Sequence, residues 1–126
     1  MKPFCEIMVN DIFPAIRAVI AKELTETLNY TQSDAARLMG VTQPAISQYK
    51  KEFRGTKIKI LTENETINIA LKDAARNLTT LKSPFDSHIM CDLCKNIRQE
   101  GLLCKLHREA VPALSKCDTC ITNSEC

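Results

Sequence analysis

The sequence predicts a mainly α-helical protein with two parts: helices over residues 1–82 and a small cysteine-rich module over residues 83–126. Three observations predict this organisation. Apolar residues recur every three or four positions over long stretches, which is the helical period. A glycine at position 40 separates two short amphipathic segments, and six of the seven cysteines lie beyond residue 88.

The composition is that of a small globular chain. Of its 126 residues 44% are hydrophobic, and tryptophan is absent, so the core is expected to consist of aliphatic side chains. The net charge is +2, but Lys and Arg exceed Asp and Glu by nine to six up to Ile60 and fall short by eight to nine after it. The basic excess therefore belongs to the first half of the chain, where it suits a phosphate backbone, although a solvated face gives the same pattern.

The first helix is expected from Asp11 to Leu28. Asn10 or Asp11 is expected to cap it, and Pro14 is tolerated in its first turn. Its apolar face follows the helical period at Ile12, Ile16, Val19, Ile20, Leu24 and Leu28.

Two shorter helices follow around a tight turn. Thr31 is an N-cap residue for a helix over Gln32–Met39, and Gly40 ends it as the residue that best accepts a positive φ. Thr42 caps a third helix, expected over 43–53.

The next segment, "RGTKIKIL", is β-prone and is expected to form a connector or small wing. Thr62 with Glu65 forms a capping box for a fourth helix over 63–80. Its apolar positions form a heptad seam of Ile67, Leu71, Ala74, Leu78 and Leu81. Such a seam packs either on a twin in a dimer or on the chain's own core, and the sequence leaves both open.

The segment from Gln32 to Lys51 resembles the helix-turn-helix of the phage-repressor-like, or XRE-like, transcription regulators. Ala36 stands where two helices cross closely, Gly40 at the turn and Ile46 at the inner anchor of the second helix. The string "GVTQPAIS" is also typical of that family, and the resemblance covers about 12–54. It implies double-stranded DNA as the partner, a homodimer and palindromic half-sites.

The outer face of the third helix would then enter the major groove. Glutamines pair with adenine edges, serine bonds to bases or phosphates, and the lysines and arginine hold the DNA backbone. The expected DNA-binding residues are Gln32, Thr42, Gln43, Pro44, Ser47, Gln48, Lys50, Lys51 and Arg54. The alternative is a three-helix core that binds no DNA.

The last part of the chain carries two Cys-x-x-Cys pairs, a spacing that lets two thiolates face one metal ion through a tight turn. The expected ligands are Cys91, Cys94, Cys104, Cys117 and Cys120. Two sets of four are possible: Cys91 and Cys94 with either Cys117 and Cys120 or Cys104 and His107. Cys126 is terminal, His88 is not expected to be a ligand, and Cys5 is expected to be a buried small hydrophobe.

The metal is not fixed by the spacing. Paired knuckles most often hold a structural zinc, whereas more thiols than one zinc needs favour an iron–sulfur cluster, with [4Fe–4S] as the expected form. A thiol–disulfide switch is a third possibility. The chain resembles small archaeal regulators that join an XRE-like helix-turn-helix to such a tail, and that resemblance leaves the metal open.

Other classes of protein are disfavoured. The chain shows no signal-peptide pattern and no apolar run long enough for a membrane, so a cytoplasmic location is expected, where thiols stay reduced. An enzyme is not expected, because the sequence has no nucleophile elbow and no glycine-rich phosphate loop. Its Cys-x-x-Cys pairs also lack the βαβ context of a thioredoxin-like oxidoreductase.

Together the patterns predict a helix-turn-helix DNA-binding domain over 1–60, a dimerisation helix over 61–82 and a cysteine-rich metal- or cluster-binding module over 83–126. The expected function is a sequence-specific transcription regulator whose iron–sulfur cluster senses redox state or iron supply. The alternatives are the same regulator with a structural zinc and no sensing, and an oligomeric adaptor that binds no DNA.

Overall fold

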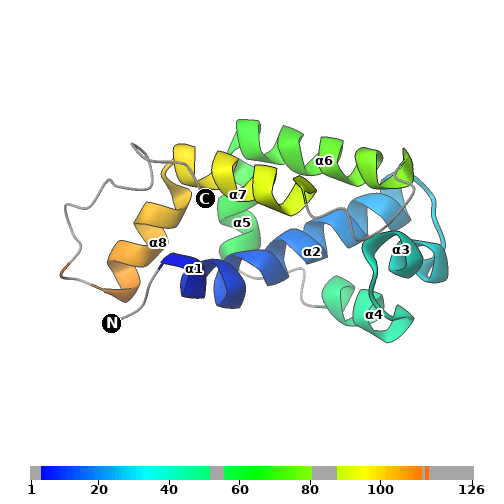
Figure 1. Ribbon diagram of the computed structural model, residues 1–126. Helices are drawn as coiled ribbons and strands as arrows, with labels where there is room; N and C mark the ends of the chain where they lie inside the picture. Colours follow the sequence, from blue (N-terminus) through cyan, green and yellow to red (C-terminus); the bar gives the residue numbers. More distant parts are fainter. Residues whose placement is uncertain (1–3, 52–55, 81–87, 112, 114–126) are drawn as a thin grey trace.

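The computed structural model describes residues 4–51, 56–80, 88–111 and 113, and in these ranges every regular element is helical (Figure 1). The prediction of a mainly α fold is therefore confirmed. In the described part of the chain, no helix combines the length and the apolar character needed to cross a membrane.

The chain begins with a long helical run built from four consecutive pieces: α1 (Phe4–Ile7), the π-helical turn η1 (Met8–Ile12), α2 (Phe13–Lys22) and the π-helical turn η2 (Glu23–Thr27). The predicted apolar face is correct: Leu28 is partly buried against the core, and the other predicted residues are buried, namely Ile12, Ile16, Val19, Ile20 and Leu24.

The predicted start of this run at Asp11 is wrong. The run begins at Phe4, and Asn10 and Asp11 lie inside the π-helical turn instead of capping a helix. The reason is packing: Ile7 and Met8 are only 3% and 2% exposed, so they extend the buried face toward the N-terminus. A cap-forming residue does not end a helix whose apolar face continues on both sides of it.

The segment after the second short helix is also helical. Helix α5 spans Thr56–Glu63, so the predicted β-prone connector is wrong. Ile58 and Leu61 are three residues apart, which places them on one helical face, and both are buried. Helix α5 packs on α2, and this burial outweighs the local Lys-Ile-Lys-Ile alternation.

Helix α6 spans Glu65–Thr80, and its cap differs from the predicted one. The N–H of Ile67 donates to Oδ1 of Asn64 at 3.1 Å, so Asn64 is the N-cap residue. Thr62 lies inside α5, where its hydroxyl donates to the carbonyl oxygen of Ile58 at 2.9 Å. The predicted capping box of Thr62 and Glu65 is therefore not formed.

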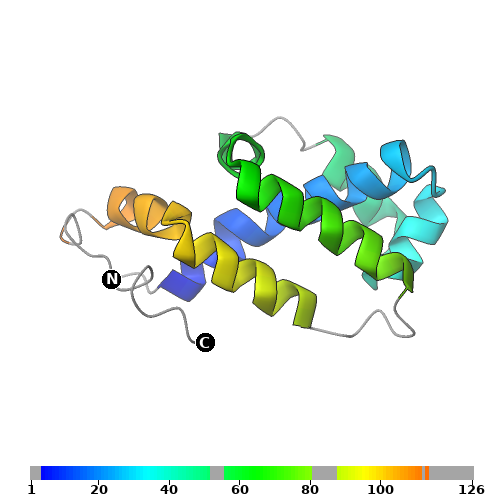
Figure 2. The same cartoon turned by 90° about the horizontal axis from the view of Figure 1, so that it is seen from above.

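The heptad seam of α6 packs inside this chain. The seam residues that the structure describes are all buried: Ile67, Leu71, Ala74 and Leu78. Helix α6 contacts α2, α5 and α7; it lies above α2 in Figure 1 and crosses in front of it in Figure 2. Two interpretations of the seam were possible, and the described residues support the one in which it packs on the chain's own core. Leu81 lies outside the described residues.

Two further helices, α7 (His88–Gln99) and α8 (Leu102–Ala110), follow and turn about Gly101, which has a φ of 76°. Helix α7 packs on α6, and α8 packs on α7 and α1. Their apolar side chains join the same hydrophobic core as the first helices. Up to Ala110, the cysteine-rich region is thus continuous with the core, and α8 lies at the end of the molecule opposite α3 and α4 (Figures 1 and 2).

The observed cap of α6 gives a stability test. Replacing Asn64 with Ala removes the acceptor for the Ile67 N–H and is expected to lower the free energy of unfolding by about 1 kcal/mol. Replacing Thr62 with Ala is expected to cost less than about 0.5 kcal/mol, because a hydroxyl bonded back to its own helix adds little stability. Urea unfolding of both variants checks this; a larger loss for the Thr62 variant would contradict the assignment.

Candidate nucleic-acid interface and cysteine pair

Helix α3 (Gln32–Met39) starts at the predicted cap. Thr31 has an extended backbone with φ −68° and ψ 160°, and its Oγ1 accepts a hydrogen bond from the N–H of Asp34 at 3.1 Å. The carbonyl of Thr31 accepts from the N–H of Ala35 at 2.9 Å, which is the first bond of the helix. The N-cap prediction is confirmed.

The turn after α3 needs a glycine. Gly40 has φ 68° and ψ 32°, a left-handed conformation in which a Cβ atom would be crowded. The N–H of Gly40 donates to the carbonyl of Arg37 at 3.3 Å, and the N–H of Val41 donates to that of Ala36 at 2.9 Å. This pair of bonds is a Schellman motif, which closes α3 and fixes the direction in which the chain leaves it.

Helix α4 (Gln43–Lys51) is capped by Thr42, whose Oγ1 accepts a hydrogen bond from the N–H of Ala45 at 3.3 Å. The predicted cap is confirmed, and the helix extends to the last described residue before the gap at 52–55. Ser33 adds a contact that the sequence did not predict: its hydroxyl donates to Oε1 of Gln43 at 3.1 Å and joins the starts of the two helices.

The inner face of the two helices is small and apolar. Ala35 and Ile46 are completely buried and Ala36 is 4% exposed, so α3 and α4 approach each other without a large side chain between them. Tyr49 is half-buried beside them, and α4 packs on both α2 and α3. The predicted inner face of the helix pair is confirmed.

The outer face carries the predicted DNA-binding residues. Thr42, Gln43, Pro44, Gln48 and Lys51 are exposed, while Gln32, Ser47 and Lys50 are half-buried. All eight lie on α3, α4 or the turn between them, at one end of the molecule (Figure 1). Arg54 lies outside the described residues.

Positive charge is concentrated at the end of α4 and the start of α5. Lys50 and Lys51 occupy the last turn of α4, and Lys57 and Lys59 lie on α5. Among the described residues, no acidic side chain forms an ion pair with Lys50 or Lys51. These ammonium groups are therefore available to an external anion.

The first cysteine pair has a different local structure from the predicted one. Cys91 and Cys94 lie within helix α7, not in a tight turn, with Cys91 exposed and Cys94 half-buried. Residues three apart share a helical face with Cβ atoms roughly 5–6 Å apart, so the two thiols can still reach one metal ion. Helical placement is therefore compatible with two of the four positions of a tetrahedral site.

Cys104 lies elsewhere. Its side chain is only 4% exposed and is buried on α8 together with Leu103 and Leu106, where it packs as a small hydrophobe. In the ranges that the structure describes, no three His, Cys, Asp or Glu side chains gather closely enough to hold a metal ion. The predicted set of Cys91, Cys94, Cys104 and His107 is thus not assembled.

The remaining predicted ligands belong to the last part of the chain. Cys117 and Cys120 lie outside the described residues, as does Cys126. Cys5 falls within α1, but its side chain lies outside the description, so its predicted burial stays a prediction.

Comparisons with protein-family models, with curated proteins and with solved structures find no match to this chain. The case for any function therefore depends on the residues themselves.

The turn between the two helices can be tested by substitution at Gly40. Replacing it with Ala puts a Cβ atom into the left-handed region and is expected to cost about 1–2 kcal/mol of stability. Replacing it with Asn should cost less, since Asn tolerates this conformation better than Ala. Urea unfolding measures both, and an Ala variant as stable as the parent would contradict the turn geometry.

Proposed function

We propose that this protein binds double-stranded DNA in a sequence-specific manner through α3 and α4 and acts as a transcription regulator. The observation that carries the proposal is the geometry of the helix pair. The Schellman turn at Gly40 and the close contact at Ala36 fix α4 against α3, and the polar side of α4 faces away from the core. A helix held this way can enter the major groove without disturbing its own packing.

The outer residues of α4 have suitable chemistry for this role. Gln43 and Gln48 carry amides that suit adenine edges, and the hydroxyl of Ser47 suits a base or a phosphate. Gln32 stands at the N-terminus of α3, where backbone N–H groups and the helix dipole favour a phosphate. Lys50 and Lys51 would contact the DNA backbone and make binding salt-dependent.

A homodimer remains part of the proposal, on the strength of the resemblance to XRE-like regulators. The heptad seam no longer supports it, because the described seam residues are buried within one chain. A dimer contact would therefore use a different surface. Ile69, on the other side of α6, is 52% exposed and marks one such surface.

We further propose that Cys91 and Cys94 bind a metal centre together with Cys117 and Cys120. The exposed Cys91 and half-buried Cys94, on one helical face, fit two positions of such a site. An iron–sulfur cluster would make DNA binding sensitive to oxygen or iron supply, whereas a zinc ion would only stabilise the fold. Buried Cys104 is not included, because its thiol faces the apolar core.

The DNA test starts from a selection of bound sequences out of a random duplex library. With the selected site, Lys51→Gln should weaken binding and lower the slope of log affinity against log salt by about one. The matched control is Lys105→Gln, which removes the same charge from an exposed position on α8, at the other end of the molecule. Anisotropy at several salt concentrations measures both variants.

The proposal is wrong if no sequence is enriched, or if the two variants lose affinity equally. A protein that enriches no sequence but forms stable oligomers would instead fit the adaptor alternative. Light scattering of the same preparation gives the oligomeric state.

The metal proposal is tested by anaerobic purification followed by iron, sulfide and zinc analysis. Cys91→Ser and Cys94→Ser should each lose most of the bound metal, because each removes one of four ligands. Cys104→Ala should retain it and lose only stability, since this thiol is buried among leucines. Iron matching sulfide supports a cluster, about one zinc without sulfide supports the structural alternative, and full metal loss in Cys104→Ala would contradict the assignment.

A further inference from the structure

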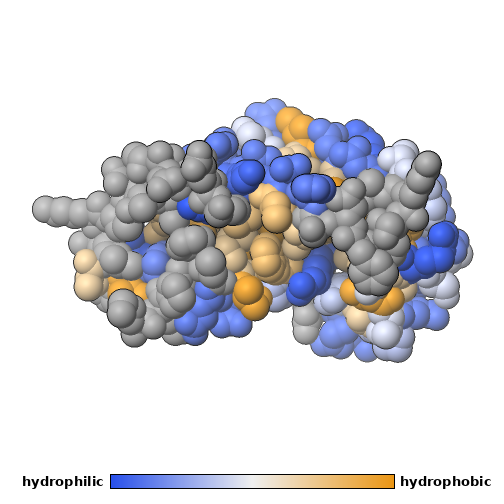
Figure 3. All heavy atoms as spheres, viewed as in Figure 1, coloured by the Kyte–Doolittle hydropathy of each residue, from blue (hydrophilic) through white to orange (hydrophobic). Residues whose placement is uncertain are grey.

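A pocket of about 290 Å³ lies where the helix-turn-helix meets α2, α6 and α7. Its walls are apolar side chains from each of these elements: Ile20, Met39, Val41, Leu78, Ile89 and Met90. In Figure 3, which has the same view as Figure 1, apolar residues are exposed in the middle of the molecule.

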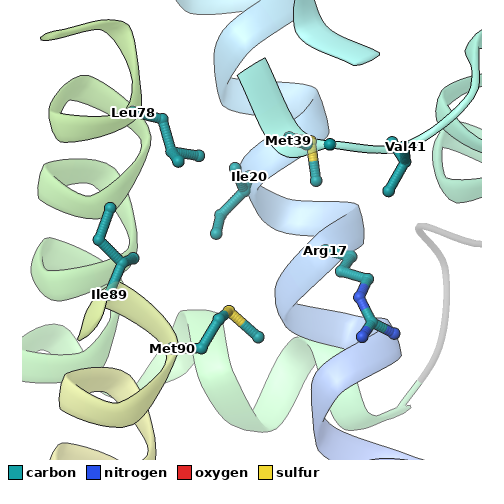
Figure 4. A pocket seen from close by; sticks show the side chains of 8 residues that line it. Arg17, Ile20, Met39, Val41, Leu78, Ile89 and Met90 are labelled. Carbon is teal, nitrogen blue, oxygen red and sulfur yellow. The ribbon is translucent and has the colours of Figure 1, made fainter. Parts of the chain in front are cut away.

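The pocket has two facing walls. In Figure 4, Leu78, Ile89 and Met90 lie on one side and Met39 and Val41 on the other, with Ile20 of α2 between them and Arg17 of α2 below Val41. Gly40 also lines it, so the pocket reaches the turn of the helix-turn-helix. Both methionines have flexible thioether side chains that can adjust to a ligand.

Among the residues that the structure describes, Arg17 is the one charged residue that lines this pocket. It is half-buried, and among the described residues no acidic side chain forms an ion pair with it. A guanidinium presents a planar fork of donors that matches a carboxylate, and beside apolar walls that interaction is stronger than in water. The pocket therefore combines an apolar space with one anion-binding group at its edge.

We propose that this pocket binds a small amphiphilic carboxylate, with its hydrocarbon part between the two walls and its carboxylate on Arg17. The volume is at the lower end of the about 300–1,000 Å³ of small-molecule sites, which suits a short chain or a single ring. A phosphate group is disfavoured because the described part of the lining offers one cation, Arg17. A cationic ligand is disfavoured by the same arginine.

Such a ligand would contact both the part of the molecule proposed to bind DNA and the part next to the proposed metal ligands. Met39, Gly40 and Val41 belong to the DNA-binding turn, and Met90 directly precedes Cys91. Any effect of the ligand on DNA binding rests on the proposed function. The binding itself does not, so the pocket and the proposed function can fail separately.

The experiment uses the full chain and three probes of equal length: octanoate, octan-1-ol and octylammonium. Isothermal titration calorimetry should show saturable binding of octanoate at one site. Octan-1-ol should bind about tenfold more weakly, because it lacks the charged group that faces Arg17, and octylammonium should not bind measurably. Equal binding of all three probes, or binding that does not saturate, would overturn the proposal.

Variants then test the location. Arg17→Gln should weaken octanoate binding by about tenfold and leave octan-1-ol binding unchanged. The matched control is Arg76→Gln, which removes an exposed guanidinium on α6 that pairs with Asp73 and does not line the pocket; it should bind octanoate like the parent. Met90→Trp, which fills the space between the walls, should weaken octanoate and octan-1-ol alike.

Thermal unfolding without ligand shows whether each variant is folded before its binding is interpreted. Unchanged octanoate affinity in folded Arg17→Gln overturns the role of the arginine. Unchanged affinity in both Arg17→Gln and Met90→Trp places the octanoate elsewhere and overturns the site.

Discussion

Burial of the apolar face of the first helical run positions most of the described structure. Helix α2 contacts α4, α5 and α6, and α1 contacts α8, so both ends of the molecule are attached to this run. Ile12, Ile16 and Leu24 are fully buried along it. Each such side chain contributes about 1.5–3 kcal/mol. The ion pairs Lys22–Glu26, Arg37–Asp34 and Arg76–Asp73 are exposed i,i+3 or i,i+4 pairs and contribute much less. The placement of α3 and α4 therefore depends on apolar contact with α2 and little on surface charge.

The sequence predicted those elements whose limits are set by local chemistry. Helices α3 and α4 were predicted because their ends are set by nearby residues. Thr31 and Thr42 accept hydrogen bonds from backbone N–H groups three residues later, and Gly40 takes the left-handed conformation that ends α3. The start of the first run and helix α5 were missed because tertiary packing decides them. The sequence around Ile58 and Leu61 predicts a β-prone segment. In the folded chain both side chains lie on one helical face, which is buried where α5 packs on α2.

The candidate sites also divide into features set by local chemistry and features set by tertiary packing. The polar outer face of α4 could be predicted from the sequence, since Ile46 and Tyr49 already predicted its inner face. The Cys-x-x-Cys spacing could not show that Cys91 and Cys94 lie on a helix, nor that Cys104 packs in the core, because spacing does not distinguish a helical face from a turn. The pocket beside Arg17 could not be predicted, because it is formed by four elements that are distant in the sequence.

This pocket also changes how a signal from the cysteines would reach the turn at Gly40, for which DNA binding is proposed. A route through a dimer helix is weakened, because the seam of α6 is buried in one chain. A shorter route exists: Met90 lines the pocket across from Met39 and Val41, and Cys91 is the next residue on the same rigid helix (Figure 4). A metal centre that shifted the start of α7 by about 1–2 Å, the usual size of helix shifts in switching proteins, would change the width of the pocket between Met90 and the turn at Gly40. Metal and ligand would then act on one junction, and each would alter the affinity of the protein for the other by the same factor.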